Sequence, residues 1–301
     1  MQFDPFYINN AVAALDQTSA TEQQLTNEIS SGVRVNSLSD DPVAAGENVL
    51  LSSQLNLDDS FSQTESSTVG MLQVTDSTLG SVVSQLTKAL SLATGANNGT
   101  MNASDLQQVS TELAGIRDEV LSLANTPYAS QYIFSGSQGG TAPFTLNSGT
   151  TPSTVTYNGD TAVSYVTTPT GQQIQINLPG SQIFTNATNN VLQTLNNLVA
   201  DYSSGTVSST AASDTTALTS VLNYVGQQRV ILDNSITQLQ SAQTYTQTQG
   251  TQITSAQTNL LQADVAQVAT QLSTAETQQA ALTQVVNLLE QNSGGLFSVL
   301  Q

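Results

Sequence analysis

Histidine and cysteine are both absent from the 301 residues of this sequence. Their absence excludes Ser-His-Asp and Cys-His catalysis, thiol chemistry, disulfides and the usual zinc ligands. A chain without disulfides fits a cytosolic protein, and it fits equally a protein that crosses a cell envelope unfolded. The composition leaves these two possibilities open.

Carboxylates are the remaining candidates for chemistry. Asp40-Asp41 and Asp58-Asp59 are adjacent pairs, but neighbouring residues on a helix do not face each other, so a carboxylate glycosidase is a weak alternative. No loop has the alternating carboxylate spacing of a calcium site, which makes calcium binding a second weak alternative. We therefore expect no catalytic residue, no cofactor and no metal.

Basic residues are scarce, at four against 22 acidic ones, for a formal net charge of −18. Phosphate backbones and anionic membrane surfaces should repel such a chain, so we expect neither nucleic acid nor membrane as a partner. The opening residues MQFDPFYINN lack the features of a secretory signal peptide, and no apolar run approaches the ~18 residues of a transmembrane helix. We expect any export to use a route without a cleaved signal.

Proline is missing from residues 43–126 and 180–301, which predicts long helices there because proline interrupts helices. The clearest evidence is a C-terminal stripe whose members are alternately four and three residues apart, the spacing of a coiled-coil seam. The stripe consists of Leu261, Val265, Val268, Leu272, Ala275, Gln279, Leu282, Val286 and Leu289. A looser pattern before it predicts one long helix over 216–290, with Gly226 and Gly250 as candidate breaks.

Further stripes over 69–93 and 106–123 predict a helical hairpin with its turn at 95–99. Ser104 and Gln107 match a capping box for the second helix. A weaker N-terminal stripe includes Val12, Leu15, Leu25 and Ile29. We expect that helix to stop at Gly32 and the next to restart at Asp41-Pro42.

Residues 127–187 contain short β-favouring runs between glycine, proline and asparagine. Asn158-Gly159 lies between two of these runs and predicts a hairpin turn. The fold class expected is therefore mainly α with a β-rich insertion, in which long N- and C-terminal helices form a coiled-coil-like bundle around a small central β domain.

Four segments carry a family resemblance. Residues 30–55, SSGVRVNSLSDDPVAAGENVLLSSQL, resemble the N-terminal segment of the bacterial flagellin family, although an ordinary helix–turn–helix is the alternative. YIFSGSQ at 132–138 followed by VTYNGD at 155–160 is similar to the hook-associated members, and residues 260–300 resemble the terminal helix of the family. The matching positions are Gly32, Arg34, Asn36, Ser37, Asp40, Asp41, Pro42, Tyr132, Phe134, Gly136, Tyr157, Asn158, Gly159 and Asp160.

The resemblance implies a structural protein of the bacterial flagellum and not an enzyme. It implies a subunit of the junction between hook and filament; the alternatives are a flagellin of the filament itself and, in another class, a surface adhesin or secreted coiled-coil effector. The subunit would be exported unfolded by the type III export apparatus with an export chaperone. It would then self-associate in a ring outside the cell, beside a neighbouring hook-associated protein and flagellin.

The resemblance also suggests a division of the chain into five parts. These are an N-terminal assembly and export arm (1–45), a helical hairpin (46–126), the β-rich insertion (127–187), a helix, loop and start of the return helix (188–250), and a C-terminal assembly helix (251–301). The expected assembly interface comprises Val12, Leu15, Leu25 and Ile29 together with the C-terminal stripe.

Overall fold

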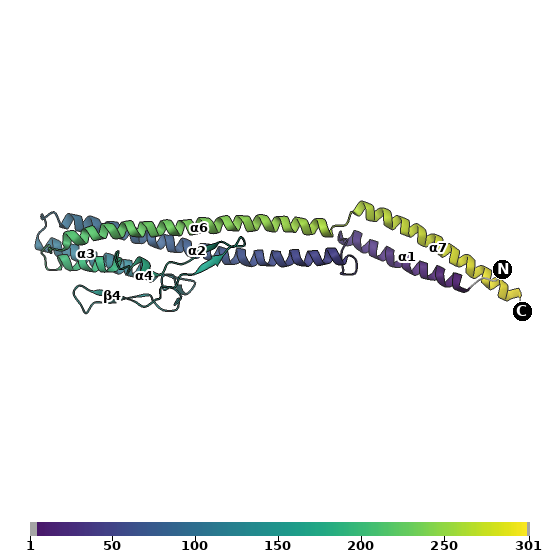
Figure 1. Cartoon of the computed structure of the whole chain (residues 1–301), viewed down its shortest axis with the longest axis horizontal. Coiled ribbons are helices and arrows are strands. Elements are labelled where there is room, and N and C mark those ends of the chain that lie inside the picture. Colours follow the sequence, from purple (N-terminus) through teal and green to yellow (C-terminus); the bar gives the residue numbers. More distant parts are fainter. Residues whose placement is uncertain (1–4, 300–301) are drawn as a thin grey trace. The chain divides into compact units, whose positions relative to one another are not determined.

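The computed structural model describes the backbone of residues 5–299 and the side chains of residues 9–288. Its helices are α1 (Pro5–Ser31), α2 (Pro42–Ala96), α3 (Ala103–Ala124), α4 (Gly180–Ile183), α5 (Val191–Ser203), α6 (Ala211–Leu261) and α7 (Val265–Val299). Its strands are β1 (Pro127–Tyr128), β2 (Gln131–Tyr132), β3 (Phe144–Asn147), β4 (Thr154–Tyr157), β5 (Tyr165–Thr167) and β6 (Gln173–Gln175). The predicted fold class, mainly α with a small β-rich insertion, is confirmed (Figure 1).

The chain forms two compact units. The terminal unit comprises residues 1–57 and 249–301, and the central unit comprises residues 58–248. Helices α2 and α6 contribute residues to both units. In the terminal unit α1 and α7 run side by side, although they come from opposite ends of the chain (Figure 1).

The central unit has the larger hydrophobic core. Its buried residues come mainly from α2, α3, α5 and α6, and Phe184 makes edge-to-face ring contacts with Phe134 and Phe144 in the same core. The stripe predicted over 106–123 is the buried side of α3. Burial of this apolar face, and not intrinsic helix propensity, is the main source of stability for such helices.

Most predicted helix boundaries are confirmed, because they depend on residues close in sequence. Helix α1 ends at Ser31, just before Gly32, and α2 begins at Pro42. The predicted capping box at Ser104 and Gln107 is wrong. Asn102 caps α3 instead: its side chain accepts the Asp105 N–H, and the Asp105 carboxylate accepts the Asn102 N–H. Ser104 already lies inside the first turn.

The single long helix predicted over 216–290 is also wrong. Gly226 and Gly250 lie within the continuous helix α6, and the break comes later, at residues 262–264. Gln262 forms an antiparallel bridge with Val33, and the Ala263 N–H donates to the carbonyl of Gly32 at 3.0 Å. Asp264 then accepts hydrogen bonds from the N–H groups of Ala266 and Gln267, which caps the start of α7.

The six strands form three antiparallel ribbons, β1–β2, β3–β4 and β5–β6. The predicted hairpin turn at Asn158-Gly159 is therefore wrong, because β4 pairs backward with β3 and not forward with β5. The Asn158 N–H donates to the Pro143 carbonyl at 2.7 Å, which continues the β3–β4 ribbon by one more bond.

Gly159 lies in a space too small for any side chain. A Cβ at this position would stand 2.5 Å from the Tyr157 hydroxyl oxygen and 2.6 Å from the backbone carbonyl oxygen of Ser135. The Tyr157 hydroxyl is itself held 3.0 Å from the Phe134 carbonyl and 2.7 Å from the Asp160 carbonyl. Neither neighbour can move without breaking backbone contacts of the β-rich region.

We expect Gly159→Ala to destabilise the central unit by about 1–3 kcal/mol, the usual cost of forcing a group into a packed region. The measurement is thermal unfolding by circular dichroism. Gly140→Ala is the matched control, since a Cβ there would meet nothing within 4 Å. Equal melting temperatures for the two variants would show that Gly159 is not tightly enclosed.

Candidate assembly surface

The loop between α1 and α2 connects the two sequence ends of the terminal unit. Gly32 has φ +69°, a left-handed conformation that favours glycine, and its N–H donates to the Glu28 carbonyl at 2.8 Å to end α1. The next residue, Val33, forms the bridge to Gln262, and the Arg34 N–H donates to the Leu261 carbonyl at 2.7 Å. The glycine stop thus places the loop against the point where α6 gives way to α7.

Asp40 organises the middle of this loop. Its carboxylate accepts hydrogen bonds from the backbone N–H groups of Asn36 and Ser37 and from the Ser37 hydroxyl, at 2.8 to 3.0 Å. These bonds, first of all those from Ser37, hold the pKa of Asp40 below its usual value. The ionised carboxylate therefore stabilises the loop, and this contribution is lost as the pH falls through the lowered pKa.

Asp41 caps α2 and holds Arg34. One carboxylate oxygen accepts the Ala44 N–H at 3.0 Å, and the other lies 3.1 Å from the Arg34 guanidinium. The Ala44 bond, followed by Arg34, lowers the pKa of Asp41. The same guanidinium donates to the Leu260 carbonyl at 3.3 Å. The family-motif residues Gly32, Arg34 and Asp41 thus connect α1, α2 and α6 within the terminal unit.

The predicted interface stripe is used largely inside the chain. Leu25, Val268 and Ala275 are buried, and with Ala263, Ile29 and Leu272 they form the core between α1 and α7. Leu15, Leu261, Gln279, Leu282 and Val286 are half-buried. Val12 and Val265 are 41% and 51% exposed, and Val265 is the first residue of α7. The side chain of Leu289 lies outside the described residues.

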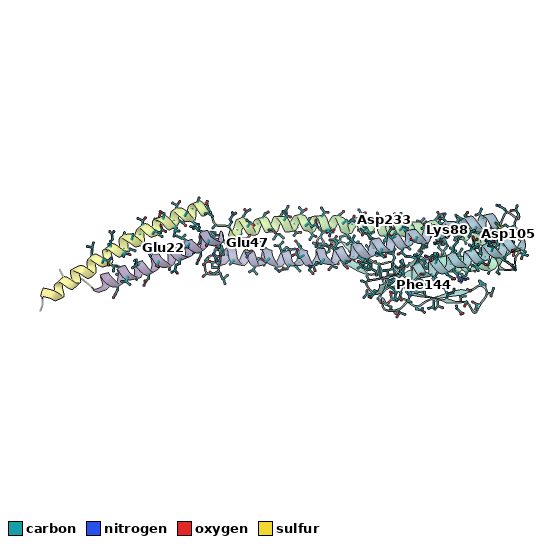
Figure 2. The ribbon with its side chains drawn as sticks, turned by 180° about the vertical axis from the view of Figure 1, so that it is seen from behind. Glu22, Glu47, Lys88, Asp105, Phe144 and Asp233 are labelled. Carbon is teal, nitrogen blue, oxygen red and sulfur yellow. The ribbon has the colours of Figure 1, made fainter. Side chains whose placement is uncertain are left out.

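A second apolar surface lies on α2 and was missed by the sequence reading. Val43, Leu50 and Leu57, here called the α2 stripe, are 79%, 71% and 62% exposed. Their spacing of seven residues places them on one side of the helix. Val49 is also exposed, and Glu47, labelled in Figure 2, is the one charged residue between positions 42 and 57. The seven-residue spacing was visible in the sequence, but exposure of this face was not.

The other motif residues support the fold of the central unit. Phe134 is fully buried, with its ring centroid 5.1 Å from that of Phe184. Gly136 has φ +72°, and a Cβ there would collide with Asp160. The Asp160 carboxylate accepts the N–H groups of Ser137 and Ala162 and the Ser137 hydroxyl. The same small region contains Tyr132, Tyr157, Asn158 and Gly159. The YIFSG and YNGD strings therefore contact each other in the folded chain.

The described residues contain no group of three or more carboxylate, histidine or cysteine side chains able to hold a metal ion. None of the described helices is long and apolar enough to cross a membrane.

Residues 7–139, from α1 through the first strands, match the family model for the bacterial flagellin N-terminal helical region. The resemblance of this chain to the bacterial flagellin family is therefore confirmed. Hook-associated protein 3 is one of the proteins that it resembles. The Salmonella typhimurium protein of that name is 28% identical over 182 residues, which are 60% of this chain and 56% of the relative. The chain thus spans about half the length of this curated relative.

Two solved structures show the same fold. One, assigned as a flagellar hook-associated protein of Vibrio parahaemolyticus, has a TM-score of 0.58 and 20% identity, covering 74% of this chain and 97% of that one. The other is the flagellar junction protein FlgL from Legionella pneumophila, with a TM-score of 0.52 and 14% identity, covering 64% and 98%. At 20% and 14% sequence identity, the similarity to these two structures is a similarity of fold.

We expect Asp41→Ala to speed hydrogen exchange at the amide of Ala44 severalfold, because the amide loses its capping acceptor. Asp41→Asn should stay close to the unsubstituted protein, since asparagine also caps helices. Exchange followed by mass spectrometry of peptides covering the start of α2 distinguishes the two. If both variants exchange alike, the cap at Asp41 does not hold the start of α2.

Proposed function

We propose that this chain is a structural subunit of the bacterial flagellum, situated at the junction between hook and filament. The α2 stripe is the observation that carries the proposal. Exposed apolar side chains at heptad spacing, on a helix segment (42–57) with a single charged residue, suit a surface that a neighbouring subunit covers. Similarity to hook-associated protein 3 supports the junction as the location, with a flagellin of the filament as the alternative.

The small core of the terminal unit supports assembly through this region. The α1–α7 contact buries only a few apolar residues, including Leu25, Val268 and Ala275, and leaves Val12, Val265, Val285 and Leu288 exposed. Long paired helices gain most of their stability from packing, so neighbours that cover these residues would add to it. The predicted interface at Val12 and Val265 is retained in this proposal, and the α2 stripe extends it.

Charge distribution points to the same region. Two copies with a net charge of −18 repel each other, so close contact is least unfavourable where charges are few. Residues 42–57 of α2 and residues 265–288 of α7 each contain one charged residue, Glu47 and Glu276. Neutral side chains at these positions avoid the cost of burying unpaired charges between subunits.

The proposed partners follow from this location. The subunit would self-associate in a ring outside the cell and contact a neighbouring hook-associated protein and flagellin. It would reach that site unfolded, with an export chaperone and the type III export apparatus, and act as a structural component without catalytic activity.

Leu50→Asp tests the α2 stripe. Leu50 is largely exposed in the monomer, so the melting temperature should change by no more than about 2 °C, as for other surface substitutions. In the assembled flagellum a neighbouring subunit would bury this carboxylate without a partner, at a cost of several kcal/mol. Cells whose own copy of the gene is replaced by this variant should secrete the protein but carry hooks without filaments in electron micrographs.

Asn56→Asp is the matched control, because it adds the same charge at an exposed position of the same helix, away from the α2 stripe. Normal filaments are expected for this control. If cells with Leu50→Asp form normal filaments, the α2 stripe is not part of the assembly surface. Filaments that form but break at random along their length would favour the alternative role as a filament flagellin.

Val268→Asp tests the intramolecular pairing. Val268 is 6% exposed in the α1–α7 core, where an unpaired carboxylate should cost several kcal/mol. Limited proteolysis should digest α1 and α7 faster while the central unit persists, and motility should be lost. Unchanged protection of α7 would show that Val268 does not pack against α1.

A further inference from the structure

Glu65 is a fully buried glutamate. It lies on α2 in the central unit, its side chain is 0% exposed, and neither carboxylate oxygen accepts a hydrogen bond from a described residue. Helix α6 covers it: the neighbouring residue Ser66 accepts a hydrogen bond from the Gln243 amide at 3.0 Å, and Thr246 is buried one turn further along α6. The carboxyl group is therefore enclosed between two helices.

No cation compensates a negative charge at this position. On α2 the nearest ionisable residues are Asp58 and Asp59 before it and Asp76 after it, and Asp76 is paired with Arg229 at 2.8 Å. Eleven residues separate Glu65 from Asp76, a helical rise of roughly 16 Å. On α6 no charged side chain occurs between Asp233 and the end of the helix at Leu261, and the one other ionisable group facing this stretch is the exposed Tyr245.

An ionised carboxylate without hydrogen bonds or a counter-charge is costly to bury, whereas a neutral carboxylic acid is much less so. Burial raises the pKa of Glu65 to about 7. The nearby backbone of Gln243 acts in the opposite direction, but it does not reach hydrogen-bonding geometry with either carboxylate oxygen, so burial prevails. The buried threonines of this part of α2 are satisfied locally, since the hydroxyls of Thr68 and Thr75 donate to carbonyls one turn earlier. Glu65 differs because neither of its carboxyl oxygens has a hydrogen-bond partner among the described residues.

We propose that Glu65 carries a proton when α2 and α6 are packed together, so that it makes the pairing of these helices sensitive to pH. In the unfolded chain the pKa of the residue is near 4.5. The folded value is higher, so the stabilisation is fully present below pH 4.5 and is lost as the pH rises toward about 7. Formation of this contact takes up a proton across that window, and the inference holds whatever the chain assembles with.

Asp214 is a second group whose titration could produce a similar pH dependence of stability, so its contribution has to be separated from that of Glu65. Burial and the neighbouring Asp201 raise its pKa as well, which gives a pH dependence of the same sign in the same unit. The test must therefore compare variants that differ only at Glu65, because the Asp214 contribution is then common to both.

Urea unfolding of the full chain between pH 4.5 and 8 tests the proposal, using the unsubstituted protein, Glu65→Gln and the exposed control Glu119→Gln. The unfolding equilibrium constant of the unsubstituted protein, relative to Glu65→Gln, should rise by up to tenfold per pH unit between pH 5 and 7 and level off above. Glu119→Gln should follow the unsubstituted protein. Parallel curves for the unsubstituted protein and Glu65→Gln would overturn the proposal.

A direct measurement does not require any variant to fold. Carbon-13 NMR of the glutamate side-chain carboxyls in the unsubstituted protein should show Glu65 titrating near pH 7. A midpoint near 4.5 for Glu65 would overturn the proposal even if Glu65→Gln cannot be purified.

Discussion

The pairing of α1 with α7 is the interaction on which the terminal unit depends. It joins opposite ends of the chain through a small apolar core around Leu25 and Val268, and the Val33–Gln262 bridge closes it at the loop. Helix α7 carries only two charged residues, Glu276 and Glu290, so a chain with a net charge of −18 can still bring it against α1. The same scarcity of charge leaves the α2 stripe suited to contact with a second subunit.

The central unit is built differently, since a continuous core holds it and its motif residues support one another. Asp160 binds the backbone of the Gly136–Ser137 turn, while Gly159 leaves room for Tyr157. These contacts explain why YIFSG and YNGD occur together although they are separate in sequence. The central unit is therefore stabilised by its own core, whereas the terminal unit has a small core and exposed apolar side chains. In our proposal, the central unit folds by itself, and the terminal unit completes its packing only against neighbouring subunits in the assembly.

The local features of the fold could be predicted from the sequence. Gly32, Pro42 and the stripe on α3 each act through residues within a few positions, and the structure has them where expected. The errors involve partners distant in sequence. The break after Leu261 depends on Val33, and the pairing of β4 with β3 decides the role of Asn158-Gly159. The C-terminal stripe was recognisable, but its internal partner on α1 and the exposure of Leu50 required the three-dimensional arrangement.

Accessibility of a single thiol tests the central claim most directly. Because the chain lacks cysteine, Leu50→Cys and Val268→Cys each introduce one thiol that a maleimide reagent can label. We predict that Leu50→Cys reacts readily in the monomer and is protected in intact flagella, whereas Val268→Cys is protected in both. Equal labelling of Leu50→Cys in monomer and flagella would contradict the account, because the α2 stripe would then remain uncovered after assembly.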